Sequence, residues 1–184
     1  MSIPGEDLGW ARAAILNYLE SHRNGQRLSL STNEDQRRWL EWLGVEYVED
    51  SGGERASFTR TPIATDETLG SLWARGMLGE MVFSLLTQTL WHPDQTQPCA
   101  RTKAEILVLF DPAEIEEPGW GLDLPRWSEV NHERLQELTP GEILDAALAH
   151  CREAPKGRRA DLEAQILLHL EGLHSLLDVP PLLQ

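Results

Sequence analysis

The sequence predicts an α+β fold that is predominantly helical, with a small N-terminal unit packed on a helical body. Apolar residues recur at helical spacing over 6–23, 66–91 and 160–177, whereas short alternating segments are confined to the first third of the chain. With 184 residues, 41% of them hydrophobic, the chain is long enough to bury a core without disulfides or metals. We therefore expect a small α/β unit with a hairpin over 1–62 and a mainly helical body over 63–184.

The order of elements in the N-terminal unit follows from its start and stop signals. Asn24-Gly25 ends the first helix, while Ser31 and Glu34 form a capping-box pattern that starts the second helix. A polar turn over 50–53 joins the last two strands. The predicted elements are a helix over 6–23, a strand over 27–31, a helix that ends at Gly44, and strands over 45–48 and 56–60.

The helical body is predicted around one long helix over 66–91, whose apolar residues cover nearly its whole circumference. Such a helix is buried as a central helix or lies at an interface, and an exposed face on it would imply a homodimer or a permanent complex with another protein. Gly76 and Gly79 would let another backbone approach closely. The short apolar run over 104–110 predicts a buried strand. The remaining predicted elements are a turn capped by Asp111 and helices over 128–138, 139–153 and 160–177, the second opening with the capping-box residues Thr139 and Glu142.

Charge and cysteine content exclude several classes of protein. The net charge is −14, from 16 Lys and Arg against 30 Asp and Glu, so we do not expect a non-specific nucleic-acid binder. Cys99 and Cys151 lack a CxxC partner, which is typical of a reduced cytoplasmic protein. The N-terminus shows no signal-peptide pattern, and the apolar stretch 69–91 carries Arg75 and Glu80, so a membrane partner is not expected.

The uneven distribution of charge is the strongest functional signal. Residues 111–150 hold ten acids and two arginines, a local balance of −8, while the other 144 residues carry −6. A block of charge is more often an interaction surface than a catalytic site, and the spacing of these acids matches no calcium-binding loop. The sequence therefore predicts an acidic face over 111–145 that docks a protein with a basic or apolar patch, and no cofactor or metal is expected.

A tryptophan-containing loop lies next to these acids. Trp120 and Trp127 bracket a glycine- and proline-rich loop within 116–127, and tryptophan is enriched at binding hot spots. Core packing, by contrast, accounts for Trp39 and Trp73. We expect a non-enzymatic accessory or adaptor protein. Its predicted partner-binding residues are Glu114, Glu116, Glu117, Trp120 and Trp127.

The first third of the chain, in the order helix, strand, helix, strand, turn, strand, resembles a winged-helix module. The resemblance implies a nucleic-acid-binding regulator as an alternative function. Arg37 and Arg38 in the second helix would then contact the nucleic acid, together with Arg55 and Arg60 beside the hairpin. Residues 20–64 hold six arginines against eight acids, which is a poor balance for DNA binding.

An enzyme is the second alternative. The sequence motifs of common nucleotide-binding, hydrolase and zinc sites are absent from the chain. Glu80 projects between Leu69, Trp73 and Phe83 on the predicted helix, where a carboxylate must be paired, hydrogen-bonded or protonated. Glu80 is therefore either a buried catalytic acid or base, or one half of an ion pair with an arginine. His169 lies on the apolar face of the last helix, where we expect a core histidine.

Overall fold

The computed structural model describes residues 7–49, 58, 63, 65–92, 99–115, 122–151 and 155–183. It is mainly helical with one small sheet, which confirms the predicted α+β, mostly helical fold. The α-helices are α1 (Leu8–Arg23), α2 (Glu34–Trp42), α3 (Leu69–Ala74), α4 (Gly79–Gln88), α5 (Lys103–Leu109), α6 (Leu124–Glu137), α7 (Pro140–Leu148) and α8 (Arg159–His169). The strands are β1 (Ser29–Leu30) and β2 (Val48–Glu49), and the 3-10 helices are η1 (Pro112–Glu114), η2 (Leu170–Gly172), η3 (Leu176–Asp178) and η4 (Pro180–Leu183).

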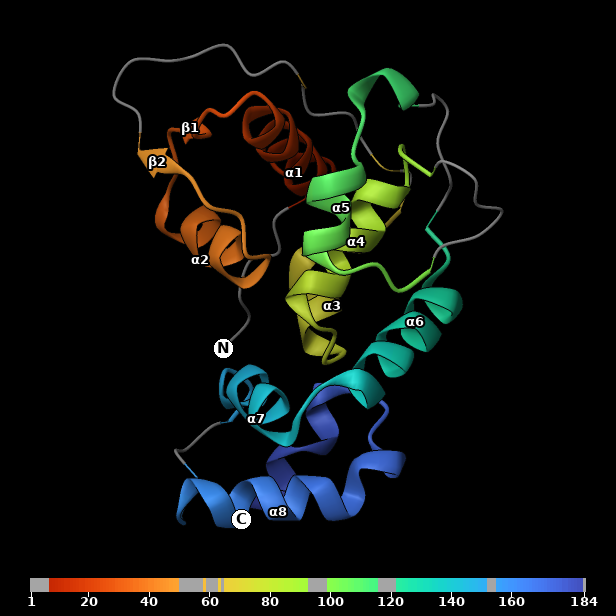
Figure 1. The fold of residues 1–184 in the computed structure, drawn as a ribbon. Coiled ribbons are helices and arrows are strands. Elements are labelled where there is room, and N and C mark those ends of the chain that lie inside the picture. The colour runs from red at the N-terminus through yellow and green to blue at the C-terminus, as the bar shows by residue number, and fades with distance from the viewer. Residues whose placement is uncertain are drawn as a thin grey trace.

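The helices form one elongated arrangement around a continuous apolar core. The N-terminal helices α1 and α2 lie at one end of the molecule and α7 and α8 at the other, with α3 and α4 between them (Figure 1). Within this core α1 packs on α4, α4 packs on α5 and α6, and α7 packs on α8. The division at residues 62–63 stays a prediction, and the apolar cluster contains residues from both sides of it.

The two strands pair with each other in parallel, and α2 is the crossover between them. The predicted hairpin is a different pairing, and its turn over 50–53 and return strand over 56–60 lie outside the described residues, apart from Phe58. The Asn17 side chain donates to the Phe58 carbonyl and accepts from the Phe58 N–H, at 2.8 and 2.9 Å, which holds this residue against α1. The register places Ser29 opposite Val48 and Leu30 opposite Glu49.

The capping box of α2 is formed by Asn33 and Gln36, so its assignment to Ser31 and Glu34 was wrong. The Asn33 side chain accepts a hydrogen bond from the Gln36 N–H at 2.8 Å, and the Gln36 side chain accepts one from the Asn33 N–H at 3.1 Å. Both sequence patterns satisfy the spacing rule, and the one that lies directly before the helix is used. The helix stops before Gly44, as predicted, where φ is +69°.

The long helix predicted over 66–91 is two helices, α3 and α4, which corrects that expectation. The break lies at Gly76, whose φ of +70° ends α3. The Gly76 carbonyl accepts a hydrogen bond from the Leu176 N–H at 2.9 Å, and a Cβ on Gly76 would lie 2.7 Å from the Leu177 nitrogen. The turn is therefore a docking point for the C-terminal segment. The expectation of a buried central element holds for α4, since Met81 and Phe83 are fully buried.

The segment predicted as a buried strand over 104–110 lies instead in α5 (Lys103–Leu109) and its C-cap residue Phe110. Thr102 and Glu105 make a capping box, in which the Glu105 N–H donates to Thr102 Oγ1 at 3.2 Å and the Thr102 N–H donates to Glu105 Oε2 at 2.7 Å. Val108 and Leu109 are 83% and 52% exposed, so this apolar run is only partly buried. A short apolar run does not distinguish helix from strand by itself, and the cap decides the outcome here.

Three helix boundaries in the second half differ from the prediction. α6 begins at Leu124 because Asp123, not Ser128, provides its N-cap. α7 opens with the expected Thr139 and Glu142 capping box but ends at Leu148. α8 ends at His169, and the chain then continues through η2 to η4.

The segment after α8 completes the core. Four of its apolar side chains are buried, and α6 holds its backbone: His132 Nδ1 lies 2.8 Å from the Leu173 carbonyl oxygen, and Gln136 donates to the Leu170 carbonyl at 2.8 Å. The buried residues of this segment are Leu173, Leu176, Val179 and Leu183. Among the described residues, none of the helices has the length and apolar character needed to cross a membrane.

Candidate functional site

The acids at the start of the predicted face 111–145 are engaged within the protein. Asp111 Oδ1 lies 2.8 Å from Arg23 Nη1, and its side chain caps η1. The Asp111 carboxylate accepts hydrogen bonds from the Ala113 N–H and from Arg23, and these lower its pKa, the first more than the second. Glu114 Oε2 accepts a hydrogen bond from Trp91 Nε1 at 3.2 Å. These carboxylates therefore have structural partners.

An acidic stripe remains exposed along α6. Glu129, Glu133 and Glu137 follow one another at intervals of four residues, which places them on one face of the helix, and more than half of each side chain is exposed. Arg126 contacts Glu129 and Glu133 at 3.1 and 3.2 Å, and Arg134 contacts Glu137 at 3.0 Å. Three carboxylates thus face two guanidinium groups, and the stripe stays net acidic.

Trp127 belongs to the core, which corrects its assignment to a partner-binding surface. Its side chain is fully buried, because α6 starts before it and turns this residue inward together with Val130. Glu116, Glu117 and Trp120 lie outside the described residues. Trp127 therefore contributes stability rather than an exposed anchor.

The arginines named by the winged-helix resemblance are balanced by carboxylates where the structure describes them. Arg37 Nε lies 3.2 Å from Glu49, and Arg38 Nη2 lies 2.9 Å from Glu34. Arg55 and Arg60 lie outside the described residues. Because each described guanidinium faces an acid, the positive charge available to a phosphate is reduced at both positions.

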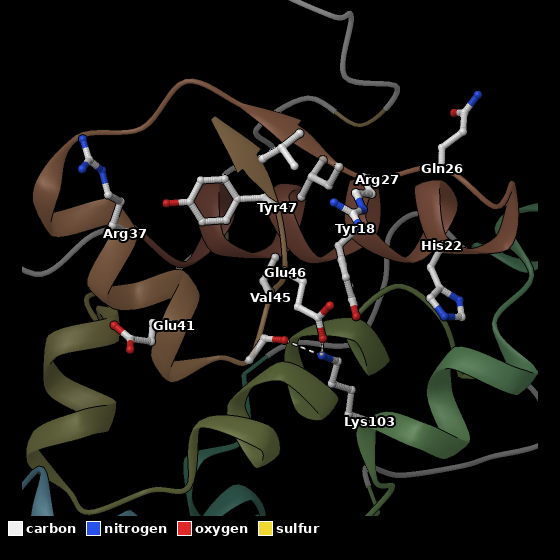
Figure 2. Close-up of a pocket in the computed structure, with 13 residues that line it drawn as sticks. Tyr18, His22, Gln26, Arg27, Arg37, Glu41, Val45, Glu46, Tyr47 and Lys103 are labelled. Atoms are coloured by element: carbon white, nitrogen blue, oxygen red, sulfur yellow. Dashed lines mark hydrogen bonds and ion pairs between the residues drawn. The ribbon is translucent and has the colours of Figure 1, made fainter. Parts of the chain in front are cut away.

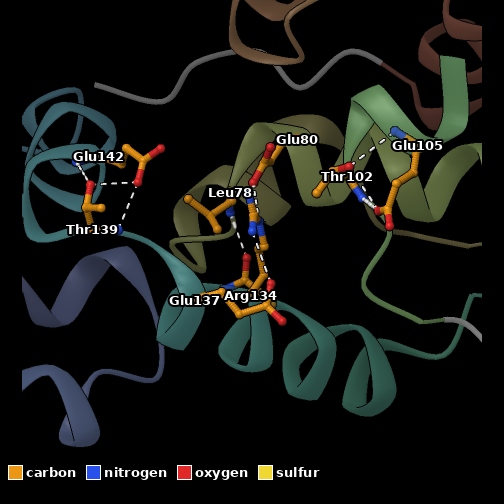
Figure 3. Close-up of polar contacts among 9 residues, drawn as sticks. Leu78, Glu80, Thr102, Glu105, Arg134, Glu137, Thr139 and Glu142 are labelled. Atoms are coloured by element: carbon orange, nitrogen blue, oxygen red, sulfur yellow. Dashed lines mark hydrogen bonds and ion pairs between the residues drawn. The ribbon is translucent and has the colours of Figure 1, made fainter. Parts of the chain in front are cut away.

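Glu80 is one half of an ion pair. Its Oε1 accepts a hydrogen bond from Arg134 Nε at 2.6 Å, and the same guanidinium reaches Glu137 (Figure 3). The Glu80 side chain is 33% exposed and that of Arg134 is 18% exposed, so the pair is only partly shielded from water. Burial opposes the charge on Arg134, but its hydrogen bonds to Glu80 and Glu137 outweigh burial and raise the pKa of the guanidinium.

His169 is exposed on α8, which corrects the expectation of a core histidine. The buried face of this helix carries Ile166, while Leu167 and Leu168 are also exposed. The apolar pattern of α8 is therefore broader than its contact with the core. In the part of the chain that the structure describes, no group of three or more His, Cys, Asp or Glu side chains is arranged to hold a metal ion.

A hollow lined by three tryptophans lies between α2, α3 and Ala149, the C-cap residue of α7. This tryptophan hollow has a volume of about 420 Å³. Trp39 and Trp42 meet edge to face, with ring centroids 5.6 Å apart and planes at 67°. Trp39 is buried, whereas Trp42 and Trp73 are half-buried. The full lining is Asp35, Arg38, Trp39, Glu41, Trp42, Trp73 and Ala149.

The tryptophan hollow adjoins a second hollow of about 400 Å³ that contains the Glu80–Arg134 pair. The two share Trp42 and Ala149 in their linings. We call the two hollows together the tryptophan groove. The rest of the second lining is Leu78, Gly79, Leu138, Glu142, Asp145, Ala146 and Leu176.

His150 packs against Trp73 of the tryptophan hollow. Its ring stacks on Trp73, with centroids 4.4 Å apart and planes at 18°. Neither imidazole nitrogen has a hydrogen-bond partner among the described residues, and burial lowers the pKa of His150. The imidazole is therefore neutral at pH 7, and the Trp73 ring is held by a stack rather than by a polar contact.

The charged residues that line the groove are mainly acidic. Its two arginines, Arg38 and Arg134, are each bound to a carboxylate. Hydrogen bonds from Thr139 lower the pKa of Glu142, and hydrogen bonds from Arg159 lower the pKa of Asp145. The carboxylates of the groove are Asp35, Glu41, Glu80, Glu142 and Asp145. Glu142 and Asp145 belong to the predicted acidic face, so the groove lies at one end of that face.

A larger cleft of about 980 Å³ lies between α1, α2, α5 and the two strands (Figure 2). Lys103 crosses this cleft: its Nζ lies 4.8 Å from the centroid of the Tyr18 ring, and the ammonium donates to the Gly44 carbonyl. Arginines and glutamates both line the cleft, including Arg37 and Glu41 from α2. Because charges of both signs are interleaved, the cleft does not specify a class of ligand as clearly as the groove does.

The tryptophans that line the groove are not those predicted for binding. The sequence predicts core packing for Trp39 and Trp73 and partner binding for Trp120 and Trp127. Asp35, Trp39 and Trp42 recur at helical spacing, which signals one shared face of α2. That pattern does not show which part of the face stays open, because α3 and α7 complete the hollow.

No known family model matches the chain, and no curated protein is similar to it in sequence.

Proposed function

We propose that the protein is a non-enzymatic accessory or adaptor protein that acts through contacts with another protein. The observation that carries this proposal is the tryptophan groove, which combines half-buried tryptophans with an acidic rim. Tryptophan supplies a large apolar contact area and is enriched among residues that dominate binding energies. The acidic rim favours a partner segment that is both basic and apolar.

Charge supports the same kind of partner. The net charge of −14 accelerates encounters with basic surfaces. The acidic stripe Glu129, Glu133 and Glu137 adds exposed negative charge on α6, the helix that also carries Arg134 of the groove. Complementary charge raises the rate of association and favours the correct partner. The tryptophans supply the apolar contact that contributes most to the binding energy.

Affinity capture from a lysate of the native host tests the proposal. The tagged chain is compared with a variant that carries Asp35→Lys and Glu41→Lys at the groove. A matched control carries Glu20→Lys and Glu171→Lys, which changes the net charge equally outside both groove linings. We expect a stoichiometric protein that survives nuclease treatment, is retained by the control, and is lost with the groove variant.

The acidic face is tested separately by charge reversal at Glu114, Glu116 and Glu117. Loss of the partner in this variant would extend the contact surface to the start of the face. If this variant and the groove variant both retained every partner, the proposal would fail. Loss of all captured proteins after nuclease treatment would instead favour the winged-helix-like nucleic-acid regulator.

A further inference from the structure

We infer that the tryptophan hollow receives an arginine side chain from a basic segment of the partner protein. This inference rests on the proposed function and names the chemistry of the occupant at the same site. It follows from the aromatic walls, the carboxylates beside them, and the way both are held.

The walls of the hollow suit a planar cation. Trp42 and Trp73 are half-buried and line the hollow, and the buried Trp39 packs edge to face against Trp42 with the planes at 67°. The faces of aromatic rings carry partial negative charge and attract cations, most strongly at tryptophan. A guanidinium is planar and weakly hydrated, and it stacks on aromatic rings better than an ammonium does.

Two carboxylates at the hollow have no partner among the described residues. No hydrogen bond or ion pair engages the side chain of Asp35 or Glu41 within that part of the chain. Arg38, the one cation in the lining of this hollow, is bound to Glu34 at 2.9 Å. The uncompensated charge beside the indoles is therefore negative, which complements a guanidinium.

The hollow is held in shape before any partner binds. His150 stacks on Trp73, and Gly79 lies so close to Trp42 that a Cβ there would be 3.1 Å from Trp42 Cδ1. Because His150 is neutral, it places no positive charge beside Trp73. The cost of ordering the site on binding is correspondingly small.

The volume of the hollow is consistent with one side chain and its neighbours. About 420 Å³ lies in the range of roughly 300–1,000 Å³ that is typical of ligand pockets. The second hollow continues past Trp42 and Ala149 with apolar residues and the Glu80–Arg134 pair. A short peptide with an arginine flanked by leucines therefore matches both parts of the groove.

Nuclear magnetic resonance of the indole Nε1–H groups of the full chain provides the test. The protein is titrated with the blocked peptide Gly-Leu-Arg-Leu-Gly, and with the same peptide carrying citrulline, which is neutral and nearly isosteric. We expect the Trp42 and Trp73 signals to shift while that of the buried Trp127 stays in place. We expect the citrulline peptide to bind about tenfold or more weakly than the arginine peptide, because the replacement removes the positive charge.

Carboxylate variants establish the origin of the effect. Asp35→Asn with Glu41→Gln is expected to weaken the arginine peptide by about tenfold and leave the citrulline peptide unchanged. Glu20→Gln with Glu171→Gln changes the net charge equally outside both groove linings and serves as the control. Circular dichroism verifies that each variant is folded, and Trp73→Leu provides a second test that does not depend on charge.

Each outcome separates this inference from the proposed function. Equal binding of the arginine and citrulline peptides would make the occupant apolar and overturn the inference. A silent titration, together with partner capture that still depends on the groove, would overturn the inference and leave the proposed function intact. Concentration-dependent dimerisation that disappears in Asp35→Asn with Glu41→Gln would assign the hollow to a second copy of the chain, against a separate partner.

Discussion

Replacement of Gly79 by alanine is expected to be among the most destabilising small substitutions in this protein. Gly79 is the first residue of α4, and its backbone lies directly against the last residue of α2. An added Cβ would overlap the Trp42 carbonyl oxygen and would lie 2.7 Å from the Trp42 carbonyl carbon. These atoms belong to the backbone of a helix end, so they cannot rotate away as a flexible side chain can.

The size of the effect follows from this geometry. Extra methyl groups in a well-packed core usually cost about 1–3 kcal/mol, and a clash with a rigid backbone belongs at the upper end or above it. We therefore expect Gly79→Ala to lower the free energy of unfolding by about 3 kcal/mol, which corresponds to roughly 6–12 °C in Tm for a chain of this size. The shift of α2 relative to α4 should also open the tryptophan groove.

Urea denaturation monitored by circular dichroism measures the effect, with Gly172→Ala as the matched control. A Cβ at Gly172 meets no atom within 4 Å, so this variant should stay within about 0.5 kcal/mol of the wild type. If the two alanine variants unfolded with free energies within that margin of each other, the close approach of α2 and α4 would be refuted.

Three further predictions follow from the packing and electrostatics. Gly76→Ala should lower the free energy of unfolding by about 2–4 kcal/mol, because it adds a clash with the Leu177 nitrogen to the strain of φ +70°. Gly25→Ala, at φ +68° in open space, is the control and should cost about 1 kcal/mol. Equal losses of stability in thermal unfolding would rule out the clash. Because burial lowers the pKa of His150, the unfolded chain binds the proton first as the pH falls below about 6.5, so stability declines toward acid by up to about 1.4 kcal/mol per pH unit. His150→Phe keeps a ring beside Trp73 and should flatten the stability difference between pH 7 and pH 5.5, and a wild-type-like slope would contradict the assignment. In a double-mutant cycle, Glu80→Gln and Arg134→Gln should show a coupling of about 1 kcal/mol, limited by the exposure of the pair; additive effects would indicate that the ion pair contributes nothing.

Features set by neighbouring residues were predictable from the sequence. The capping box of Thr139 and Glu142 was predicted correctly, because its hydrogen bonds span three residues. The close backbone approaches at Gly76 and Gly79 were also expected from the glycines alone. The mostly helical class follows from the same local periodicity.

Features that depend on distant residues were not predictable. A run of apolar residues over 66–91 looks like one helix, but Gly76 ends α3 with a positive φ, and the packing of this turn against Leu177, about a hundred residues later, has no local signal. The parallel pairing of β1 and β2 joins two-residue strands whose alternation carries little information. The same limit applied to the candidate site, because α3 and α7 are both needed to turn the tryptophans of α2 into a hollow.

The contact between Gly76 and Leu176 has a consequence for how the chain acquires its structure during synthesis. The carbonyl of Gly76 leaves the ribosome long before its partner exists, and the apolar surfaces that receive Leu173, Leu176 and Val179 stay uncovered in the meantime. The entropy of closing so long a loop is lost before the contacts that stabilise the closed chain have formed, and this slows folding. Residues 170–183 therefore complete the core last. A nascent chain arrested before this segment exposes an apolar surface of the kind that chaperones or proteases recognise.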